Sequence, residues 1–543
     1  MESKKMKKAP PSPSLSEITQ KILLEEALIK EGGGKIGQER QQRHGRLVVR
    51  DRLDLLLDEK EAFFELGVWA GYQMYPEWGE LPAAGVVTGI GKVHNRFCMI
   101  IANDATVKAG AMFPQSVKKV LRAQRIAFEC RLPLLYLVDS SGVFLPLQAE
   151  IFPDEDDFGR IFRNNAVLSA AGIPQFAAIM GNCIAGGGYL PVLCDKLLMT
   201  KGSGLYLAGP ALVKAAIGQT VDTEDLGGAQ MHAEISGTVD FLEENDPACI
   251  VRLRELVDLL PQPPSTPTEA FAGPERDPME LYEIVSGDGK NGYSTHTLLN
   301  CIVDEGSFIE YKSHYGKSIV TGFAKIQGMP IGIVANQRAQ TLNGRKEIEI
   351  GGVIYAESAD KAARFVMDCN QIKIPLIFIQ DVVGFMVGKE AEHSGIIRSG
   401  AKLVNAISNS IVPKITIIVG NSFGAGNYAL CGKAYDPQFI LAWPNAKYAV
   451  MGAEQASNTL FAIQKQAAER KGEICDTVKI EKIREEVKKT YEDQMDIRYG
   501  AARGWVDAII PPHMTRHYLI QFLQILQDVP PKQQMFHTGV FQV

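Results

Sequence analysis

The chain has 543 residues, 46% of them hydrophobic and 22% charged, which is too long for a single core and indicates two or three globular domains. Its 57 Lys and Arg against 63 Asp and Glu give a net charge of −6, which argues against nucleic acid as the main ligand because phosphate binding needs a basic face. No apolar run reaches the length of a membrane-spanning helix, so we expect no membrane partner.

The N-terminal segment and the cysteines both favour a cytoplasmic protein. Residues 1–14 are rich in Lys and Pro and lack the apolar core of a secretory signal, so we expect a disordered arm there. The nine cysteines are scattered without a Cys-x-x-Cys pair or a Cys/His cluster at zinc spacing. We therefore predict buried thiols in a reducing compartment and no bound metal.

Short apolar runs and amphipathic stretches alternate along the chain. Residues 16–60 are predicted to be mostly helical, with Leu23, Leu24, Ala27 and Leu28 on one face. The expected strands are near-continuous apolar runs, as buried parallel sheets require, at residues 134–138, 176–180, 376–379 and 415–419. The later helices are expected at residues 117–130, 358–370, 471–498 and 514–526. Such strand–helix–strand units indicate an α/β protein with right-handed crossovers.

One strand–loop–helix signature occurs twice. Residues 172–189 read GIPQFAAIMGNCIAGGGY, and residues 411–428 read IVPKITIIVGNSFGAGNY, at an offset of 239. Further echoes at offsets of 233 and 242 pair residues 87–93 with 320–326, 101–103 with 334–336, and 132–139 with 374–381. Short solenoid repeats have periods of 20–50 residues, so this pattern indicates the duplication of a whole domain.

Each signature ends in small residues, at the point where the predicted strand ends and a helix begins. Backbone N–H groups at a helix start lie at the positive end of the helix dipole and bind anions. Aimed at a thioester or urea oxygen, they would stabilise negative charge that develops there. A purely structural interpretation is that residues 185–188 only let a helix pack closely on the sheet, but the duplication weakens it.

A different interpretation rests on Gly420-Asn-Ser-Phe-Gly424, which fits the G-x-S-x-G nucleophile elbow of serine hydrolases. Ser422 would be the nucleophile, and Asp436 and His513 follow in the expected order. The matching position in the first repeat is Cys183. A hydrolase needs one such elbow, so this hypothesis leaves the second loop unexplained.

Long ordered stretches are more specific than any short motif. They comprise residues 102–108, 137–140, 145–146, 152–154, 158–162, 208–210, 212–216, 224–229, 384–388, 424–428 and 443–446. On these stretches the chain resembles, over essentially its whole length, the carboxyltransferase (β) subunits of biotin-dependent acyl-CoA carboxylases. The resemblance is closest to the methylcrotonyl-CoA carboxylase branch.

The resemblance implies two tandem crotonase-like (ClpP/crotonase) α/β domains from an internal duplication. Residues 1–62 would form an N-terminal arm and helix, and residues 63–260 a domain that binds acyl-CoA. A Pro-rich linker would cover residues 261–278. Residues 279–543 would then form a domain that binds carboxybiotin and carries the C-terminal helices.

The resemblance also implies site residues. The amides of Ala185 and Gly186, with Gly187 adjacent, would hold the thioester enolate, and those of Ala425 and Gly426 the ureido oxygen of biotin. The other expected contacts with acyl-CoA are Lys108, Ala109, Gly110, Ser141 and Gly142, and those with biotin are Gly384, Phe385, Ser422 and Phe423. Lys108 could equally be a solvated surface lysine, and Phe385 a plain core aromatic.

Two absent motifs predict a partner. The chain has no Ala/Val-Met-Lys-Met biotinylation motif and no G-x-x-x-x-G-K nucleotide loop. Biotin and the ATP-dependent biotin carboxylase, with its biotin carboxyl carrier, would therefore reside on a separate polypeptide. The resemblance further implies a homo-oligomer, at least a dimer and in the family a hexamer, with each active site formed between two copies.

Some stretches depart from the methylcrotonyl-CoA branch. Residues 140–143 read SSGV where that branch has Ser-Gly-Gly, and the segment 336–357 is longer. Both are similar to the α subunits of glutaconyl-CoA decarboxylases, which share the fold and run carboxyl transfer backwards, whereas residues 420–432 follow the carboxylase form. The direction of the reaction and the acyl-CoA therefore stay open. A pair of domains kept only for binding is disfavoured because both loops retain their small residues.

Overall fold

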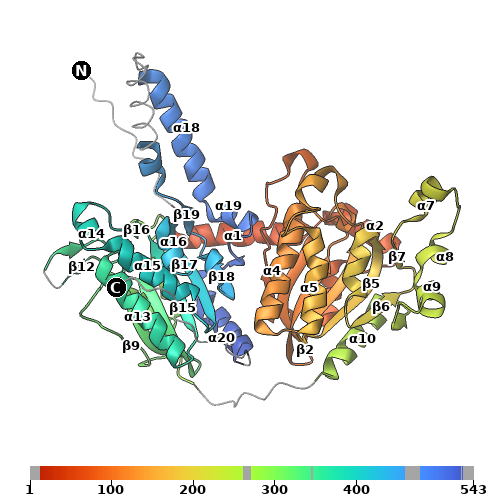
Figure 1. Cartoon of the computed structure of the whole chain (residues 1–543), viewed down its shortest axis with the longest axis horizontal. Helices are drawn as coiled ribbons and strands as arrows, with labels where there is room; N and C mark the ends of the chain where they lie inside the picture. Colours follow the sequence, from red (N-terminus) through yellow and green to blue (C-terminus); the bar gives the residue numbers. More distant parts are fainter. Residues whose placement is uncertain (1–12, 261–270, 344–345, 459–476, 528, 530–543) are drawn as a thin grey trace.

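Two eight-stranded mixed sheets, one in each half of the chain, dominate the computed structural model, which describes residues 13–260, 271–343, 346–458, 477–527 and 529 (Figure 1). In the first sheet the strand order is β1-β2-β3-β4-β5-β6-β8, with β7 paired to β5. The bounds are β1 Phe64–Leu66, β2 Val86–Val93, β3 Arg96–Asn103, β4 Leu134–Ser140, β5 Gln175–Ile184, β6 Lys196–Thr200, β7 Gly204–Tyr206 and β8 Phe241–Glu243.

The second sheet repeats the first strand for strand. Its order is β9-β10-β11-β15-β17-β18-β20, with β19 paired to β17, and in both sheets only the first two pairings are antiparallel. The bounds are β9 Ile309–Glu310, β10 Ile319–Ile326, β11 Met329–Asn336, β15 Leu376–Val382, β17 Lys414–Phe423, β18 Phe439–Ala442, β19 Lys447–Ala449 and β20 Ala508–Ile509. The predicted α/β fold and its internal duplication are confirmed.

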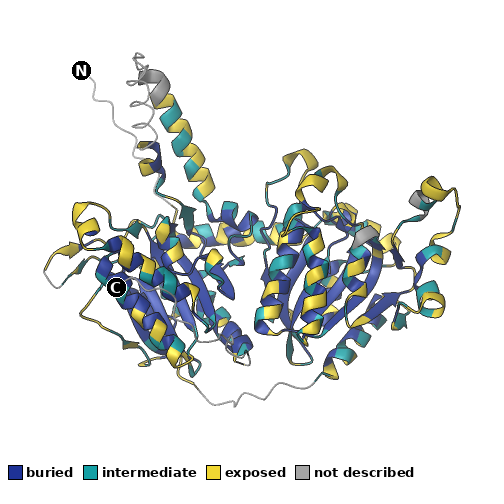
Figure 2. Ribbon diagram, in the orientation of Figure 1, coloured by how far each residue is buried: buried dark blue, intermediate teal, exposed yellow. Residues whose placement is uncertain are grey.

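The helices that cover the sheets are duplicated as well. One face of each sheet carries a pair, α4 Pro114–Cys130 with α5 Phe158–Ala170 and α13 Ala356–Gln371 with α15 Ile396–Ser408. The opposite face carries α10 Asp246–Asp258 in the first half and α20 Thr515–Leu526 in the second. Figure 2 shows the strands buried between these layers. Burial on both faces explains why the predicted strands are continuous apolar runs.

Further short elements complete the fold, most of them in the second half. Two small sheets pair β12 Thr341–Leu342 with β13 Ile348–Glu349, and β14 Val353–Ile354 with β16 Gly384–Phe385. The β12–β13 pair occupies the longer segment 336–357. The remaining helices are α6 Tyr189–Val192, α7 Pro210–Ile217, α8 Thr223–Gly227, α9 Ala229–Met231, α11 Leu281–Ile284, α12 Thr295–Leu299, α14 Lys389–His393, α16 Ala425–Ala429, α18 Thr477–Met495 and α19 Ile497–Ala502.

The N-terminal region folds into α1 Leu15–Lys30, α2 Gly34–Arg43 and α3 Val49–Leu56, so its helical prediction is confirmed. The expected apolar face of α1 is wrong. Leu24 and Leu28 are 69% and 65% exposed, because the buried face of α1 is formed by Leu15, Thr19 and Ile22 instead. Ile22 packs in a cluster that contains residues of both halves, and Figure 1 shows α1 running between them.

The C-terminal helix also joins the halves. The ring of Phe522 stacks on Phe439 of the second sheet, with 3.9 Å between centroids, and meets Phe64 of the first sheet edge-on at 4.8 Å. Arg122 of α4 forms an ion pair with Asp507 at 2.7 Å. The two duplicated units therefore share one apolar core within the chain.

Several predictions fall partly outside the described residues. These are the N-terminal arm up to residue 12, the linker at residues 261–270 and the start of the helix expected at 471–498, of which residues 477–495 form α18. The eight cysteines of the described parts are free, and all but Cys194 are buried. Within the same parts, no helix combines the length and the apolar character needed to cross a bilayer.

Candidate active site

Strands β5 and β17 each run directly into a turn of small residues. β5 ends at Ile184 and continues as a 3-10 turn over Ala185–Gly188, whereas β17 ends at Phe423 and passes through Gly424 into α16. The four predicted residues, Ala185, Gly186, Ala425 and Gly426, lie at the starts of these two turns, and the first N–H groups of a helical turn have no acceptor within it. The structure thus puts both predicted pairs at matching places.

Close approach explains the small residues of the second loop. A Cβ added to Gly426 would lie 2.4 Å from a methyl of Val382, and one added to Gly424, whose φ is +52°, would lie 2.8 Å from a backbone oxygen. In the first loop a Cβ on Gly188 would lie 3.0 Å from Leu205, whereas Gly187 has room for one. Space therefore requires glycine at Gly424 and Gly426, whereas at Gly188 the Leu205 side chain would have to shift slightly.

The residues predicted to bind acyl-CoA form a clamp of two adjacent segments beside the first loop. The amide of Ser141 donates to the carbonyl of Ala109 at 3.2 Å, and that of Met112 donates to the carbonyl of Gly142 at 2.8 Å. Gly110 must be glycine because its φ is +69° and a Cβ would lie 2.2 Å from the Asp139 carbonyl. A Cβ on Gly142 would lie 3.2 Å from the carbonyl of Ile184, so the clamp touches the strand that carries Ala185.

Lys108 is exposed and makes one hydrogen bond to the backbone. Its ammonium donates to the carbonyl of Trp78 at 2.6 Å. The residue also lines a cavity of 1010 Å³ between the turn that joins α1 to α2 and residues 68–83. A large cavity therefore adjoins the predicted acyl-CoA clamp.

A second clamp, in the other half, contains two of the predicted biotin residues. Gly384 and Phe385 form β16 and pair with β14, as Val143 pairs with Met112 in the first half. Phe385 packs against Gly400 of α15. It is therefore a half-buried aromatic of this clamp.

A cavity of 430 Å³ opens beside Ala425. It is lined by residues 422–428 in part, by β19 and by side chains of α18, all from the second half: Ser422, Gly424, Ala425, Asn427, Tyr428, Tyr448, Ala449, Val450, Tyr491, Gln494, Met495 and Trp505. No Asp, Glu, Lys or Arg is among these described lining residues, and burial raises the pKa of Tyr448 above its usual value, so the phenol stays neutral. Gly384, Phe385 and the buried Phe423 are not among its lining residues.

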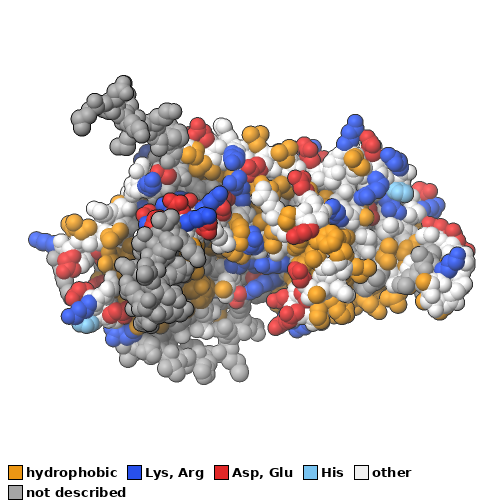
Figure 3. All heavy atoms as spheres, turned by 90° about the horizontal axis from the view of Figure 1, so that it is seen from above, with side chains coloured by type: hydrophobic (Ala, Val, Ile, Leu, Met, Phe, Trp, Pro, Cys, Tyr) orange, Lys and Arg blue, Asp and Glu red, His pale blue; other side chains and the backbone are white. Residues whose placement is uncertain are grey.

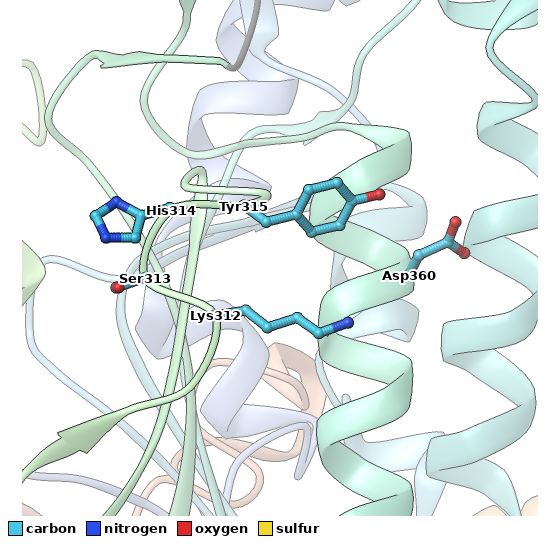
Figure 4. A pocket seen from close by; sticks show the side chains of 5 residues that line it. All are labelled: Lys312, Ser313, His314, Tyr315 and Asp360. Atoms are coloured by element: carbon cyan, nitrogen blue, oxygen red, sulfur yellow. The ribbon is translucent and has the colours of Figure 1, made fainter.

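Another cavity, of 510 Å³, lies between the β9–β10 connection and α13 (Figure 4). Lys312 and Tyr315 point toward Asp360 across it, and Ser313 and His314 complete its lining. None of these residues belongs to the two loops or to the clamps. This cavity is therefore separate from the candidate site.

The serine hydrolase hypothesis is wrong on geometry. Ser422 is 1% exposed, donates from its hydroxyl to Gln380 at 2.6 Å and accepts from Asn427 at 2.8 Å. The ring of His513 lies 2.9 Å from the hydroxyl of Tyr282 instead, and Asp436 pairs with Arg125. A nucleophile needs a base within hydrogen-bond reach, and here the three residues do not meet.

Two buried aspartates and the asparagines around them form a duplicated polar set near the loops that the sequence alone did not reveal. Asp139 and Asp381, 242 residues apart, end the echoed runs 132–139 and 374–381, yet neither receives a role there. The backbone N–H of each donates to an asparagine side chain on the neighbouring strand, and a carboxylate oxygen of each accepts from a backbone N–H near the end of the strand that leads into the loop. The asparagines involved are Asn103 and Asn182 in the first half and Asn336 and Asn421 in the second. The offset was the signal that could have found them.

Comparison with known proteins decides the family. Residues 40–537 match the model of the carboxyl transferase domain. The chain belongs to the carboxyl transferase family. It is 42% identical over 521 residues to the mitochondrial methylcrotonoyl-CoA carboxylase beta chain of Arabidopsis thaliana, covering 94% of this chain and 86% of that one.

Two further relatives are also beta subunits of acyl-CoA carboxylases. The biotin-dependent 3-methylcrotonyl-coenzyme A carboxylase beta1 subunit of Mycobacterium tuberculosis is 42% identical over 515 residues, which cover 94% of each chain. The crystal structure of the geranyl-CoA carboxylase beta subunit of P. aeruginosa is similar with a TM-score of 0.82 and 34% identity, over 96% of this chain and 94% of that one. The carboxyltransferase described here is thus the component of a biotin-dependent acyl-CoA carboxylase that acts on a CoA substrate.

Proposed function

We propose that this carboxyltransferase transfers CO2 from carboxybiotin to a methylcrotonyl-CoA-like acyl-CoA, and that its two loops divide the work. The amides of Ala185 and Gly186 stabilise the thioester enolate, and those of Ala425 and Gly426 stabilise the ureido oxygen of biotin. The observation that carries this proposal is the duplication itself: two strands at the same place in their sheets each lead into a helical turn of small residues, and the first N–H groups of such a turn have no acceptor within it. The 42% identity to two methylcrotonyl-CoA carboxylase chains favours that substrate.

Carboxyl transfer needs hydrogen-bond donors to the oxygens that become negatively charged, and it needs no side-chain base. Carboxybiotin supplies the CO2 and, once it has lost it, a ureido nitrogen that takes the substrate proton. The backbone amides then donate hydrogen bonds to the two oxygens on which negative charge develops. Loss of one such donor typically lowers the reaction rate by ~10²–10³-fold. The cavity beside Ala425, which is lined by uncharged residues of which four are aromatic, fits an uncharged bicyclic urea.

The first half is the better candidate for acyl-CoA. Its clamp of Lys108, Ala109 and Gly110 against Ser141 and Gly142 touches the end of β5, and the 1010 Å³ cavity beside Lys108 leaves room for part of a large cosubstrate. The second half lacks a lysine at the corresponding place, since Ile350 stands there. By this assignment residues 63–260 serve acyl-CoA and residues 279–543 serve carboxybiotin.

The site requires a second copy of the chain. The two loops lie in different halves, and the cavity at Ala425 is lined by second-half residues alone (Figure 1). Large apolar side chains are exposed beside both loops, and Figure 3 shows such side chains over both halves. They include Leu145, Tyr189 and Leu207 near the first loop and Val387, Tyr428 and Val450 near the second. The first half of one copy is proposed to face the second half of another in a dimer or a larger oligomer.

Biotin and ATP chemistry are assigned to a separate partner chain, because no biotinylation or nucleotide motif is present. The location proposed for the complex is the cytoplasm, which suits the eight free cysteines of the described residues.

The test is to purify the chain with its biotin-carrying partner and to measure bicarbonate fixation on a panel of acyl-CoAs. Methylcrotonyl-CoA is expected to give the highest kcat/KM, above geranyl-CoA and propionyl-CoA. The chain alone should fix no bicarbonate and hydrolyse no ATP, yet slowly decarboxylate a carboxylated acyl-CoA. Fixation that is faster on another panel member would refute the substrate assignment, and biotin bound covalently to this chain would refute the division between two polypeptides.

A further inference from the structure

Beneath each loop lies one buried carboxylate to which the proposed chemistry gives no role. Asp139 sits where the pairing of β4 with β5 shifts register, and Asp381 sits at the same shift between β15 and β17. One oxygen of each carboxylate accepts a backbone N–H near the end of the strand that leads into the loop. Asn182 N donates to Asp139 Oδ1 at 3.2 Å, and Asn421 N donates to Asp381 Oδ1 at 2.8 Å.

Each carboxylate lies directly against the strand that leads to the loop. A Cβ added to Gly181 would lie 2.0 Å from Asp139 Oδ1, and one added to Gly420 would lie 2.4 Å from Asp381 Cγ. Both aspartates are almost fully buried, at 3% and 2% exposure. A buried charge is tolerated only when it is paired and hydrogen-bonded, so each must have a cationic or donor partner.

In the first half the partners come from the N-terminal helices. Arg52 of α3 lies 3.4 Å from Asp139 Oδ2 and also donates to Asp246 at 2.8 Å and to the carbonyl of Met180 at 3.2 Å. Gln41 of α2 donates to the same carboxylate at 3.3 Å. The arm before residue 62 thus reaches the base of the acyl-CoA loop.

In the second half the partners come from the domain itself. Arg338 Nε lies 3.0 Å from Asp381 Oδ2, and a second nitrogen of the guanidinium donates to the carbonyl of Gly289 at 3.0 Å. The hydroxyl of Tyr293 donates to Asp381 Oδ2 at 3.1 Å. Burial and the neighbouring carboxylate raise the pKa of Tyr293, which keeps the phenol protonated as a donor.

We propose that Asp139 and Asp381 are positioning residues, each of which fixes the backbone path into one loop and so aims its oxyanion donors, and that Arg52 and Arg338 pair with them and hold them in the loop-binding position. This inference rests on the proposed division of work between the loops. Neither aspartate touches a substrate. Each acts through the amide of the following Asn and through the glycine that lies against it.

The physical reason is the narrow tolerance of an oxyanion hole. Amide donors stabilise a developing charge only when they are aimed at its final position, and a displacement of about 1 Å can cost ~10²-fold in rate. Replacing the carboxylate by an amide keeps an acceptor oxygen but removes the charge that Arg52 or Arg338 neutralises. Arg338 is then left buried without the carboxylate at 3.0 Å, whereas Arg52 keeps Asp246 but loses the second of its two carboxylates, and the anchor loosens.

The test uses two assays that separate the loops in the full-length chain. Decarboxylation of a carboxylated acyl-CoA without biotin reports on the first loop, and release of CO2 from free carboxybiotin without acyl-CoA reports on the second. Asp139→Asn should lower the first rate about 10²-fold and leave the second within about threefold, and Asp381→Asn should do the reverse. Hydrogen exchange should rise at residues 182–189 in the first variant and at residues 421–428 in the second.

Asp304 provides a matched control. It is also a buried aspartate that accepts two backbone N–H groups, from Gln327 and Gly328, and pairs with Arg516 at 2.7 Å, but it lies at the β10–β11 turn. Asp304→Asn should lower Tm without changing the ratio of the two rates. Where an aspartate variant fails to fold, Gln41→Met and Tyr293→Phe, which each remove one donor, should give the same selective losses at a few-fold.

The possible outcomes separate this inference from the proposed function. Equal loss of both rates in each aspartate variant, while Gly186→Val and Ala425→Val still show selective losses, would overturn the positioning role alone. If the two loop variants also lost both rates equally, the division of work between the loops would be rejected first.

Discussion

The two halves of the chain build the same loop on the same strands but hold it with different neighbours. In the first half the carboxylate under the loop is paired by Arg52, which belongs to helices outside the duplicated unit, whereas Arg338 of the second half lies just after β11 in the unit itself. The second half also carries the β12–β13 hairpin, which the described part of the first half lacks. What the duplication preserves is the register shift, the aspartate, the glycine above it and the asparagine that follows.

A second contrast concerns the last helix of each unit. Helix α10 covers its own sheet together with α3, whereas α20 packs on its own sheet and also reaches Phe64 at the edge of the other. The two equivalent helices therefore differ in their contacts: α10 covers its own sheet, whereas α20 also connects the two halves. Copies of one unit can diverge at their outer contacts while the geometry around the loop stays fixed.

The largest effect is expected from branched side chains in the loops. Gly186→Val should reduce decarboxylation of a carboxylated acyl-CoA by about 10²–10³-fold and spare CO2 release from free carboxybiotin, and Ala425→Val should do the reverse. Steady-state rates of both assays on folded protein measure this. Thermal unfolding must accompany them, because overpacking alone costs about 1–3 kcal/mol. A uniform loss of both activities in each variant would remove the functional contrast between the halves.

Substitution of Gly181 and of Gly420, which lie against the two buried aspartates, should destabilise the two halves equally. A methyl at Gly181 or Gly420 would collide with the carboxylate beneath, so each Ala variant should lose about 1–3 kcal/mol of unfolding free energy. Gly159 of α5 serves as control, because a Cβ added there would meet no heavy atom within 4 Å, and its Ala variant should gain about 0.5–1 kcal/mol. Denaturant titration gives the three values. A neutral effect at one of the two sites would show that the halves differ there.

Ser422 should matter for packing rather than for nucleophilic attack. Ser422→Ala removes hydrogen bonds to Gln380 and Asn427 and should cost about 1–3 kcal/mol of stability with only a modest change in rate. A fluorophosphonate probe should leave the wild-type chain unlabelled, as judged by intact mass. Stoichiometric labelling at Ser422 would reinstate the hydrolase hypothesis.

A further prediction concerns the pH dependence of stability at α1, which packs between the two halves. Burial raises the pKa of Glu26, which accepts a hydrogen bond from Trp69, from 4.5 to about 7, with Lys30 and Glu65 as the charged neighbours. The folded state thus holds this proton more tightly than the unfolded state. The resulting stabilisation is complete below pH 4.5 and is lost as pH rises through 7, by up to roughly 3 kcal/mol.

Glu26→Gln keeps an acceptor oxygen for Trp69 and abolishes this titration. The unfolding free energy of the variant should therefore fall less than that of the wild type between about pH 5 and pH 8, as measured by denaturant titration at each pH. Parallel curves for the two proteins would show that Glu26 is ionised in the folded state.

Much of this architecture could be predicted from the sequence, because fully buried parallel strands and a duplicated motif leave a strong apolar and periodic signal. The runs at 134–138 and 415–419 lie within β4 and β17, and the small residues mark both loops. The face of α1 could not be predicted, because Leu24 and Leu28 look as apolar as Ile22 until the tertiary contacts of α1 are known. Arg52 and Gln41 could not be linked to Asp139, since about ninety residues separate them and no local period relates them.

The most direct test of the account is to co-express Gly186→Val with Ala425→Val, each carrying a different affinity tag, and to assay the doubly purified complex with the biotin-carrying partner. If each active site joins the first half of one copy to the second half of another, a mixed pair contains one site with both loops intact. The account predicts that the mixture regains bicarbonate fixation, to roughly half of the wild-type rate in mixed pairs, although each variant alone is inactive. A mixture as inactive as its components would show that each chain uses its own two loops, and the shared site would be refuted.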